Sequence, residues 1–148
     1  MRKIIVLILL LVLFIFLEPT PVFKGCEFIN HFVFHFFHAN VWHLLGNGVC
    51  LWVMKRMNWT ASYVVSVLCS FLIVEPTVGM SGIIFSAIGI NLGRRSDSVR
   101  LGRCAVSAVL FGLLPGVSLV FHLISLLVGF GYGWSIESYR IYRRCRAS

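Results

Sequence analysis

Four polar side chains lie inside apolar stretches of this chain, and their types could support nucleophilic catalysis. Ser81, in the sequence Gly-Met-Ser-Gly, carries a hydroxyl that can act as a nucleophile, and His122 carries an imidazole that can accept its proton. His43 and Asn47 are four residues apart, so they share one helix face and offer hydrogen-bond donors. Polar groups inside a membrane segment are costly and mark candidate functional sites. Each also has a structural interpretation, as a hydroxyl bonded to its own helix or as a bridge between helices.

The composition points to a membrane protein. Of 148 residues, 59% are hydrophobic and 12% are charged, whereas soluble domains carry about 25% charged residues. This composition excludes disorder and makes a soluble globule a poor fit. The five cysteines show no CxxC and no zinc-ligand spacing, so we expect neither a disulfide framework nor a metal site from them.

Six apolar segments are predicted to form the transmembrane helices of one domain covering residues 1–148. Most are shorter than the roughly 20 residues that cross a bilayer, so flanking residues must extend them or the bilayer must thin. The first also fits a signal peptide, whose loss would leave the orientation of the others unchanged. The segments, each bounded by charged residues or by Pro and Gly, are 4–17, 41–54, 59–74, 81–93, 104–114 and 117–134.

The basic residues orient these segments. With a cytoplasmic N-terminus, twelve of the thirteen lysines and arginines fall on the cytoplasmic side, and only Lys24 lies outside. We therefore predict an all-α polytopic protein with six spans and both termini in the cytoplasm. The net charge of +8 then needs no nucleic-acid partner. The arginine-rich tail after Trp134 is expected to serve as a topology anchor or to lie against anionic headgroups.

The candidate residues fall at similar depths in the outer half of the membrane. Ser81 begins its segment, His43 lies three residues inside its own, and His122 follows Gly116 by six residues, about 9 Å along a helix. Three spans thus bring a nucleophile, a base and donors to one level. The preceding loop, 18–40, is rich in Phe and His, and we expect it to lie at the membrane interface or to dip into the outer leaflet.

The sequence resembles the rhomboid intramembrane serine proteases over essentially its whole length. The stretch from His38 to Asn47 is similar to the family's HxxxxHxxxN, and 79–82 is similar to its GxSG. The family's sixth-span histidine with spaced small residues corresponds to His122, Ser125, Gly129 and Gly133. The resemblance implies a six-helix bundle that cleaves transmembrane helices of other proteins near their outer ends, without metal or cofactor. It also implies a multi-pass location, which we expect to be a prokaryotic plasma (inner) membrane, with membrane lipid as the other partner.

The resemblance also assigns roles to residues. Ser81 would be the nucleophile and His122 the general base, while His43, Asn47 and the Ser81 backbone N–H would stabilise the oxyanion. No acidic third member is expected, and Glu75 is the acidic residue left open. The supporting residues would be Gly79, Gly82, Phe85 and His38.

The sequence departs from the family pattern at positions expected to affect substrate gating and preference, and none of these departures removes a catalytic group. The usual Trp-Arg pair of the first external loop is missing, Ser125 replaces a glycine, and Phe85 replaces a tyrosine.

Three alternative functions stay open. The chain could be an inactive rhomboid-like protein that binds membrane clients, or a channel or transporter, although its spans lack paired charges. It could also be a metal or haem protein that uses the helical spacing of His31, His35 and His38, although no HExxH is present.

Overall fold

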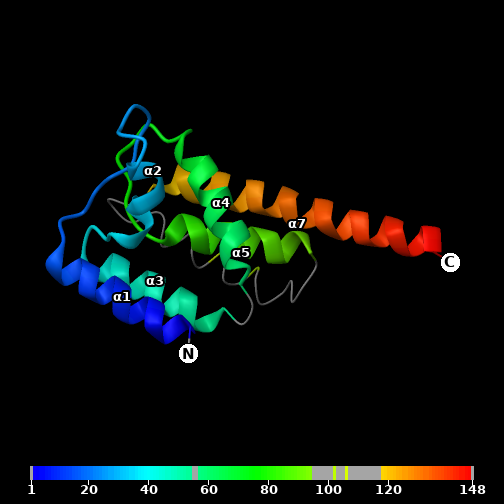
Figure 1. The fold of residues 1–148 in the computed structure, drawn as a ribbon, viewed down its shortest axis with the longest axis horizontal. Helices are drawn as coiled ribbons and strands as arrows, with labels where there is room; N and C mark the ends of the chain where they lie inside the picture. The colour runs from blue at the N-terminus through cyan, green and yellow to red at the C-terminus, as the bar shows by residue number, and fades with distance from the viewer. Residues whose placement is uncertain (1, 55–56, 95–101, 103–105, 107–117, 148) are drawn as a thin grey trace.

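The computed structural model describes residues 2–54, 57–94, 102, 106 and 118–147, and this part of the chain is helical, without a β-strand. The all-α prediction is thus confirmed for the described residues. The only pairing of extended backbone in them is an isolated bridge between Val22 and Thr77. The helices in chain order, drawn in Figure 1, are α1 (Arg2–Phe16), α2 (Asn30–Val33), the short 3-10 turn η1 (Phe34–Phe36), α3 (Val41–Val53), α4 (Trp59–Ser70), α5 (Ser81–Gly93) and α7 (Leu119–Ala147).

Asparagine caps set the beginnings of two helices. The Asn40 side chain accepts a hydrogen bond from the backbone N–H of His43 (2.9 Å) at the start of α3. Asn58 accepts one in the same way from Ala61 (3.2 Å) at the start of α4. Each cap satisfies one of the amide groups that a helix N-terminus leaves without a partner.

Two helices differ from the apolar segments that predict them. Helix α4 ends at Ser70, four residues before the apolar stretch does, and residues 71–80 form turns and loop. Helix α7 continues to Ala147, beyond the predicted end at 134, because its Tyr- and Arg-rich tail has no Pro or Gly to stop it. The predicted span 104–114 lies outside the described residues.

Helix α5 is the centre of the bundle. Its residues from Ser81 to Ile90 are all buried, and α4 and α7 pack against it. Helices α1 and α3 run side by side below these three (Figure 1). The Lys3 ammonium donates to the backbone carbonyl of Met54, which joins the start of α1 to the end of α3. A helix buried on every side shows no amphipathic pattern, and α5 is of this kind.

Glycines bring α5 and α7 into backbone contact. A Cβ added at Gly129 would lie 3.1 Å from the Ser86 Cα atom and would overlap the Ser86 carbonyl oxygen. Additions at Gly89, Gly93 and Gly133 would likewise overlap backbone atoms of the facing helix. Such stripes of small residues are typical of closely packed membrane helices.

One helix in the described part of the chain, Leu119–Arg146, is long and apolar enough to cross a membrane. The number of spans therefore stays a prediction. Large hydrophobic side chains nevertheless cover the outward faces of α1 and α3, including Phe16 (75% exposed) and Trp42 (78% exposed). An apolar surface of this extent fits contact with lipid rather than with water. Four further apolar helices have 10 to 17 residues: Lys3–Phe16, Val41–Val53, Trp59–Ser70 and Ser81–Gly93.

Candidate active site

Ser81 is the first residue of α5 and is buried. The turn before it depends on Gly79, whose φ of +114° is a conformation that side chains with a Cβ rarely adopt. The Gly79 N–H donates to the carbonyl of Phe34 (3.0 Å), so the first loop holds this turn in place. The N-terminus of α5 thereby presents backbone N–H groups and the positive end of the helix dipole beside the Ser81 hydroxyl.

His122 reaches the same region from α7. Its ring stacks on Phe85 with centroids 4.2 Å apart and an angle of 8° between planes. Phe85 lies one turn after Ser81 on α5. The adjoining residues touch as well, since a Cβ added at Gly82 would lie 2.5 Å from the Phe121 Cε1 atom. The Nδ1 atom of His122 is buried and has no hydrogen-bond partner among the described residues, where the closest ring contact of His122 is its stacking on Phe85.

The two candidate oxyanion donors lie against the turn that precedes Ser81. A Cβ added at Gly79 would lie 2.7 Å from His43 Cε1, 2.9 Å from His43 Nε2 and 3.5 Å from Asn47 Nδ2. Both ring nitrogens of His43 are buried without a partner in the described part of the chain. An N–H on either nitrogen therefore has no acceptor among those residues. The structure thus brings residues from α3 and from the start of α5 into contact.

His38 supports this arrangement from the first loop. The Asn47 amide Nδ2 donates to His38 Nε2 (3.0 Å), and the His38 ring meets the His43 ring edge-on with centroids 5.3 Å apart. Burial, with a smaller effect from His43, lowers the pKa of His38 to about 3. His38 is therefore neutral at physiological pH, and its Nε2 lone pair can hold the Asn47 side chain.

The first loop is folded against the rest of the protein, and its histidines and Phe34 are buried. Its expected place at the membrane interface or in the outer leaflet stays a prediction. Helix α4 supplies polar partners for the loop. Ser70 Oγ lies 2.8 Å from His31 Nδ1, Ser66 Oγ lies 3.5 Å from His35 Nδ1, and the Tyr63 hydroxyl donates to the carbonyl of Phe32 (2.9 Å).

The histidines of this loop do not lie on one helix face. Helix α2 ends at Val33, the 3-10 turn η1 carries His35, and the backbone is extended at Phe37 before His38. Within the described residues, no group of three or more His, Cys, Asp or Glu side chains is placed to hold a metal ion.

A stripe of serines on α4 was missed by the sequence reasoning. Ser62, Ser66 and Ser70 are each fully buried and follow one another at four-residue steps, so they share one face. The signal was present in the sequence as an i, i+4 repeat of hydroxyls in an apolar helix. Its meaning depended on the histidines of the first loop, which contact this face from 31 and 39 residues away.

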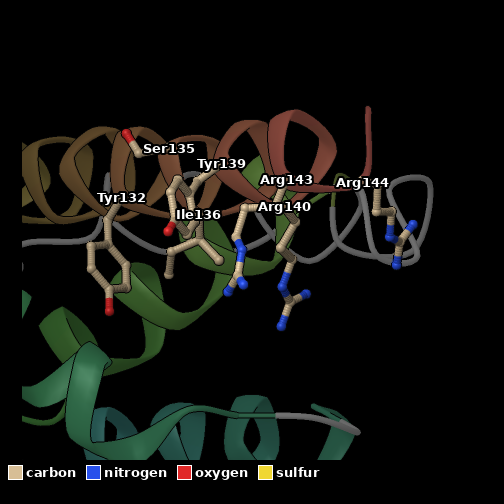
Figure 2. A pocket seen from close by; sticks show the side chains of 7 residues that line it. All are labelled: Tyr132, Ser135, Ile136, Tyr139, Arg140, Arg143 and Arg144. Carbon is tan, nitrogen blue, oxygen red and sulfur yellow. The ribbon is translucent and has the colours of Figure 1, made fainter. Parts of the chain in front are cut away.

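A hollow of about 900 Å³ lies beside the C-terminal half of α7, away from the residues considered above. Figure 2 shows tyrosine and arginine side chains extending from α7 into this region. Its lining residues are Tyr132, Ser135, Ile136, Tyr139, Arg140, Arg143 and Arg144.

A protein of Acanthamoeba polyphaga mimivirus with the name "Putative rhomboid protein L523" is 25% identical to this chain over 156 residues, which cover 89% of this chain and 90% of that protein. No family model matches the chain, and neither does any solved structure. The similarity suggests the rhomboid family. Together with the long apolar helix, it indicates a membrane protein.

Proposed function

We propose that the protein is an intramembrane serine endopeptidase of the rhomboid type, with six spans and both termini in the cytoplasm. The observation that carries the proposal is the convergence of three elements. The start of α5 presents Ser81, α7 presents His122 stacked on Phe85, and α3 presents His43 and Asn47 against the turn at Gly79. The substrates would be transmembrane helices of other membrane proteins, cut near their outer ends. A prokaryotic inner membrane stays our expectation for its location.

The proposed reaction uses a dyad. The neutral His122 imidazole takes the proton of the Ser81 hydroxyl as its oxygen attacks the scissile carbonyl carbon. The C–N bond then breaks, and the imidazolium returns the proton to the departing amine. Water, activated by the same imidazole, hydrolyses the acyl-enzyme and regenerates the serine. Stacking on Phe85 keeps the ring plane fixed through both steps.

The oxyanion formed in each step needs donors that are already in place. The Ser81 N–H at the helix N-terminus, the second amide hydrogen of Asn47 and an N–H of His43 would supply them. Because His38 fixes the Asn47 amide, the donor does not have to be ordered during the reaction. Removing one such donor typically costs about 10² to 10³ in rate.

Labelling with a fluorophosphonate probe tests the proposal on the full chain in detergent. We expect wild-type protein to be labelled at Ser81, and neither Ser81→Ala nor His122→Ala to be labelled. Ser86→Ala is the matched control, because Ser86 is buried on the same helix and its hydroxyl has no partner in the described residues. Asn47→Ala should slow cleavage of a transmembrane substrate by about 10² to 10³.

A folded wild-type protein that is neither labelled nor able to cleave would contradict the proposal. It would favour a rhomboid-like protein that binds membrane clients without cutting them. Circular dichroism and thermal unfolding of each variant distinguish loss of chemistry from loss of fold.

The proposal includes contact between the tail of α7 and anionic lipid. Arg140 is bridged to Glu137 (3.5 Å), and Tyr139 and Tyr142 are exposed beside it. Exposed arginines near a bilayer contribute about 1 kcal/mol each on an anionic surface. A fluorophore on the exposed Cys145 should therefore report deeper burial in vesicles with phosphatidylglycerol than in phosphatidylcholine. The difference should become smaller in Arg143→Gln/Arg144→Gln, because two of the four arginines of the tail are removed, and an unchanged difference would contradict the contact.

A further inference from the structure

A second chain of hydrogen-bonding side chains lies outside the candidate active site, where the first loop meets the end of α4. Cys26 Sγ is 3.6 Å from His31 Nε2, and His31 Nδ1 is 2.8 Å from Ser70 Oγ. The Ser70 hydroxyl donates to the carbonyl of Val67 (2.6 Å). A thiol, an imidazole and a hydroxyl thus form one chain in which each member contacts the next.

The hydrogen bonds of Ser70 determine which nitrogen of His31 carries the proton. Ser70 has one hydroxyl hydrogen, and Val67 accepts it, so Ser70 Oγ can only accept from His31. The proton of the neutral ring is then on Nδ1, and the lone pair of Nε2 faces the Cys26 thiol. The ring is held there by stacking on Phe71, with centroids 3.9 Å apart and planes at 12°. Burial lowers the pKa of His31, which keeps the ring in this neutral form.

Cys26 can be reached from outside. It is half-buried, and it follows Gly25, whose φ of +96° forms a turn closed by the hydrogen bond from Cys26 N–H to the Phe23 carbonyl (3.1 Å). Its sulfur also lies 3.5 Å from the Glu27 carbonyl, which is the competing acceptor for the thiol hydrogen. The charged side chains that flank it, Lys24 and Glu27, are exposed.

We infer that Cys26 is a reactive thiol, with His31 as its base, that undergoes exchange with small disulfides. A nucleophile, a base within hydrogen-bond reach and a third group that orients the base are the arrangement that activates nucleophiles generally. His31 Nε2 takes the thiol proton and the Cys26 sulfur attacks one sulfur of the disulfide. A new S–S bond forms, the old one breaks, and the departing thiolate takes the proton from His31. No oxidant beyond the disulfide is needed.

The site is positioned to affect the neighbouring loop. The segment that carries Cys26 is joined to the loop after α4 by the Val22–Thr77 bridge and by the hydrogen bond from Lys24 N–H to the Ile73 carbonyl (2.6 Å). The two segments run next to each other above α4 in Figure 1. That second segment leads directly into the turn at Gly79.

A pulse of 2,2′-dipyridyl disulfide on the full chain in detergent, followed by mass spectrometry of each cysteine peptide, tests the inference. We expect Cys26 to react faster than Cys145, although Cys145 is the more exposed residue. His31→Gln should slow Cys26 by about threefold or more at pH 7, because the thiol loses the base that takes its proton before the sulfur attacks. The rate at Cys145 should not change.

Ser70→Ala should slow Cys26 as well, because His31 loses the acceptor that fixes its tautomer. Ser62→Ala is the matched control on the same face of α4 and should leave the rate unchanged. If Cys26 reacts no faster than Cys145, or if His31→Gln leaves its rate unchanged, the inference is wrong. The pH profile of wild-type Cys26 relative to Cys145 decides the case even if a variant does not fold, since a profile identical to that of Cys145 also overturns it. Ser81→Ala should keep the full Cys26 rate, which separates this outcome from the proposed protease activity.

Discussion

The contact between α5 and α7 makes a sharp prediction, because one helix offers both a test glycine and a control glycine. A Cβ at Gly129 would lie 3.1 Å from the Ser86 Cα atom and would overlap the Ser86 carbonyl oxygen, whereas a Cβ at Gly131 meets no atom within 4 Å. Gly129→Ala and Gly131→Ala therefore add the same methyl group, two residues apart, to a tight and to an open position of α7.

The expected magnitude follows from the geometry. Ordinary van der Waals contact begins at 3.4 Å, so relieving the overlap in Gly129→Ala requires α5 and α7 to separate by on the order of 1 Å. Overpacking of this kind costs about 1–3 kcal/mol, and the better helix propensity of Ala returns up to about 1 kcal/mol. His122 lies two turns away on the same helix, and a 1 Å displacement from the serine could cost about 10² in rate.

Two measurements test this reasoning. The first is the thermal unfolding midpoint of each variant in the same detergent, which does not depend on any activity. The second is the rate of fluorophosphonate labelling. We expect Gly129→Ala to lose stability and about 10² in labelling rate, and Gly131→Ala to match wild type or to gain stability. Equal values for the two variants in both assays would refute the inference that backbone contact sets the position of His122.

Two further predictions concern the turn at Gly79 and the buried histidines. Gly79→Ala should reduce the rate of the proposed substrate cleavage by about 10². The added Cβ strains the backbone by about 1–2 kcal/mol, and it also displaces the His43 ring. Gly25→Ala carries comparable strain at φ +96° with nothing within 4 Å, so it should leave activity unchanged, and equal losses would contradict the displacement. Burial lowers the pKa of His35 to about 3, against a smaller opposing effect from the Gly79 backbone, and it lowers that of His38 to about 3. Because the unfolded chain then binds more protons below pH 6.5, stability should fall toward pH 4 by up to about 1.4 kcal/mol per pH unit for each histidine. Unfolding midpoints measured from pH 7 to pH 4 should show this slope, and a smaller one in His35→Gln.

The sequence predicts helix positions well where a local signal marks an end. Helix α5 matches its apolar segment from Ser81 to Gly93, because an arginine pair follows it. Helix α3 begins where Asn40 can cap it. The end of α7 was not predictable from hydropathy, since its backbone continues as helix after the residues stop being apolar. Hydropathy predicts where a segment is apolar, but it does not predict where the helix ends.

The candidate site was predictable in composition but not in its supporting contacts. Ser81 and His122 stand out locally, as ionisable or nucleophilic groups among apolar neighbours. The burial of His35 and His31 could not be predicted from the local sequence, because their partners are serines of α4 that are 31 and 39 residues away in the chain. A local sequence pattern shows the helical periodicity and the presence of a polar group that is costly to bury. It does not show which distant polar group will supply the hydrogen bond that satisfies both partners.

Small residues explain how a helix without an amphipathic face can still direct its neighbours. Since α5 is buried on all sides, hydrophobicity cannot specify which face meets α7. Gly129 and Gly133 of α7, with Gly89 and Gly93 of α5, specify it instead, because a Cβ at any of these positions would overlap the backbone of the facing helix. His122 lies two turns before Gly129 on α7, and its ring stacks on Phe85 of α5. The close backbone approach at the glycines and the aromatic pair therefore fix the same helix pairing at two levels.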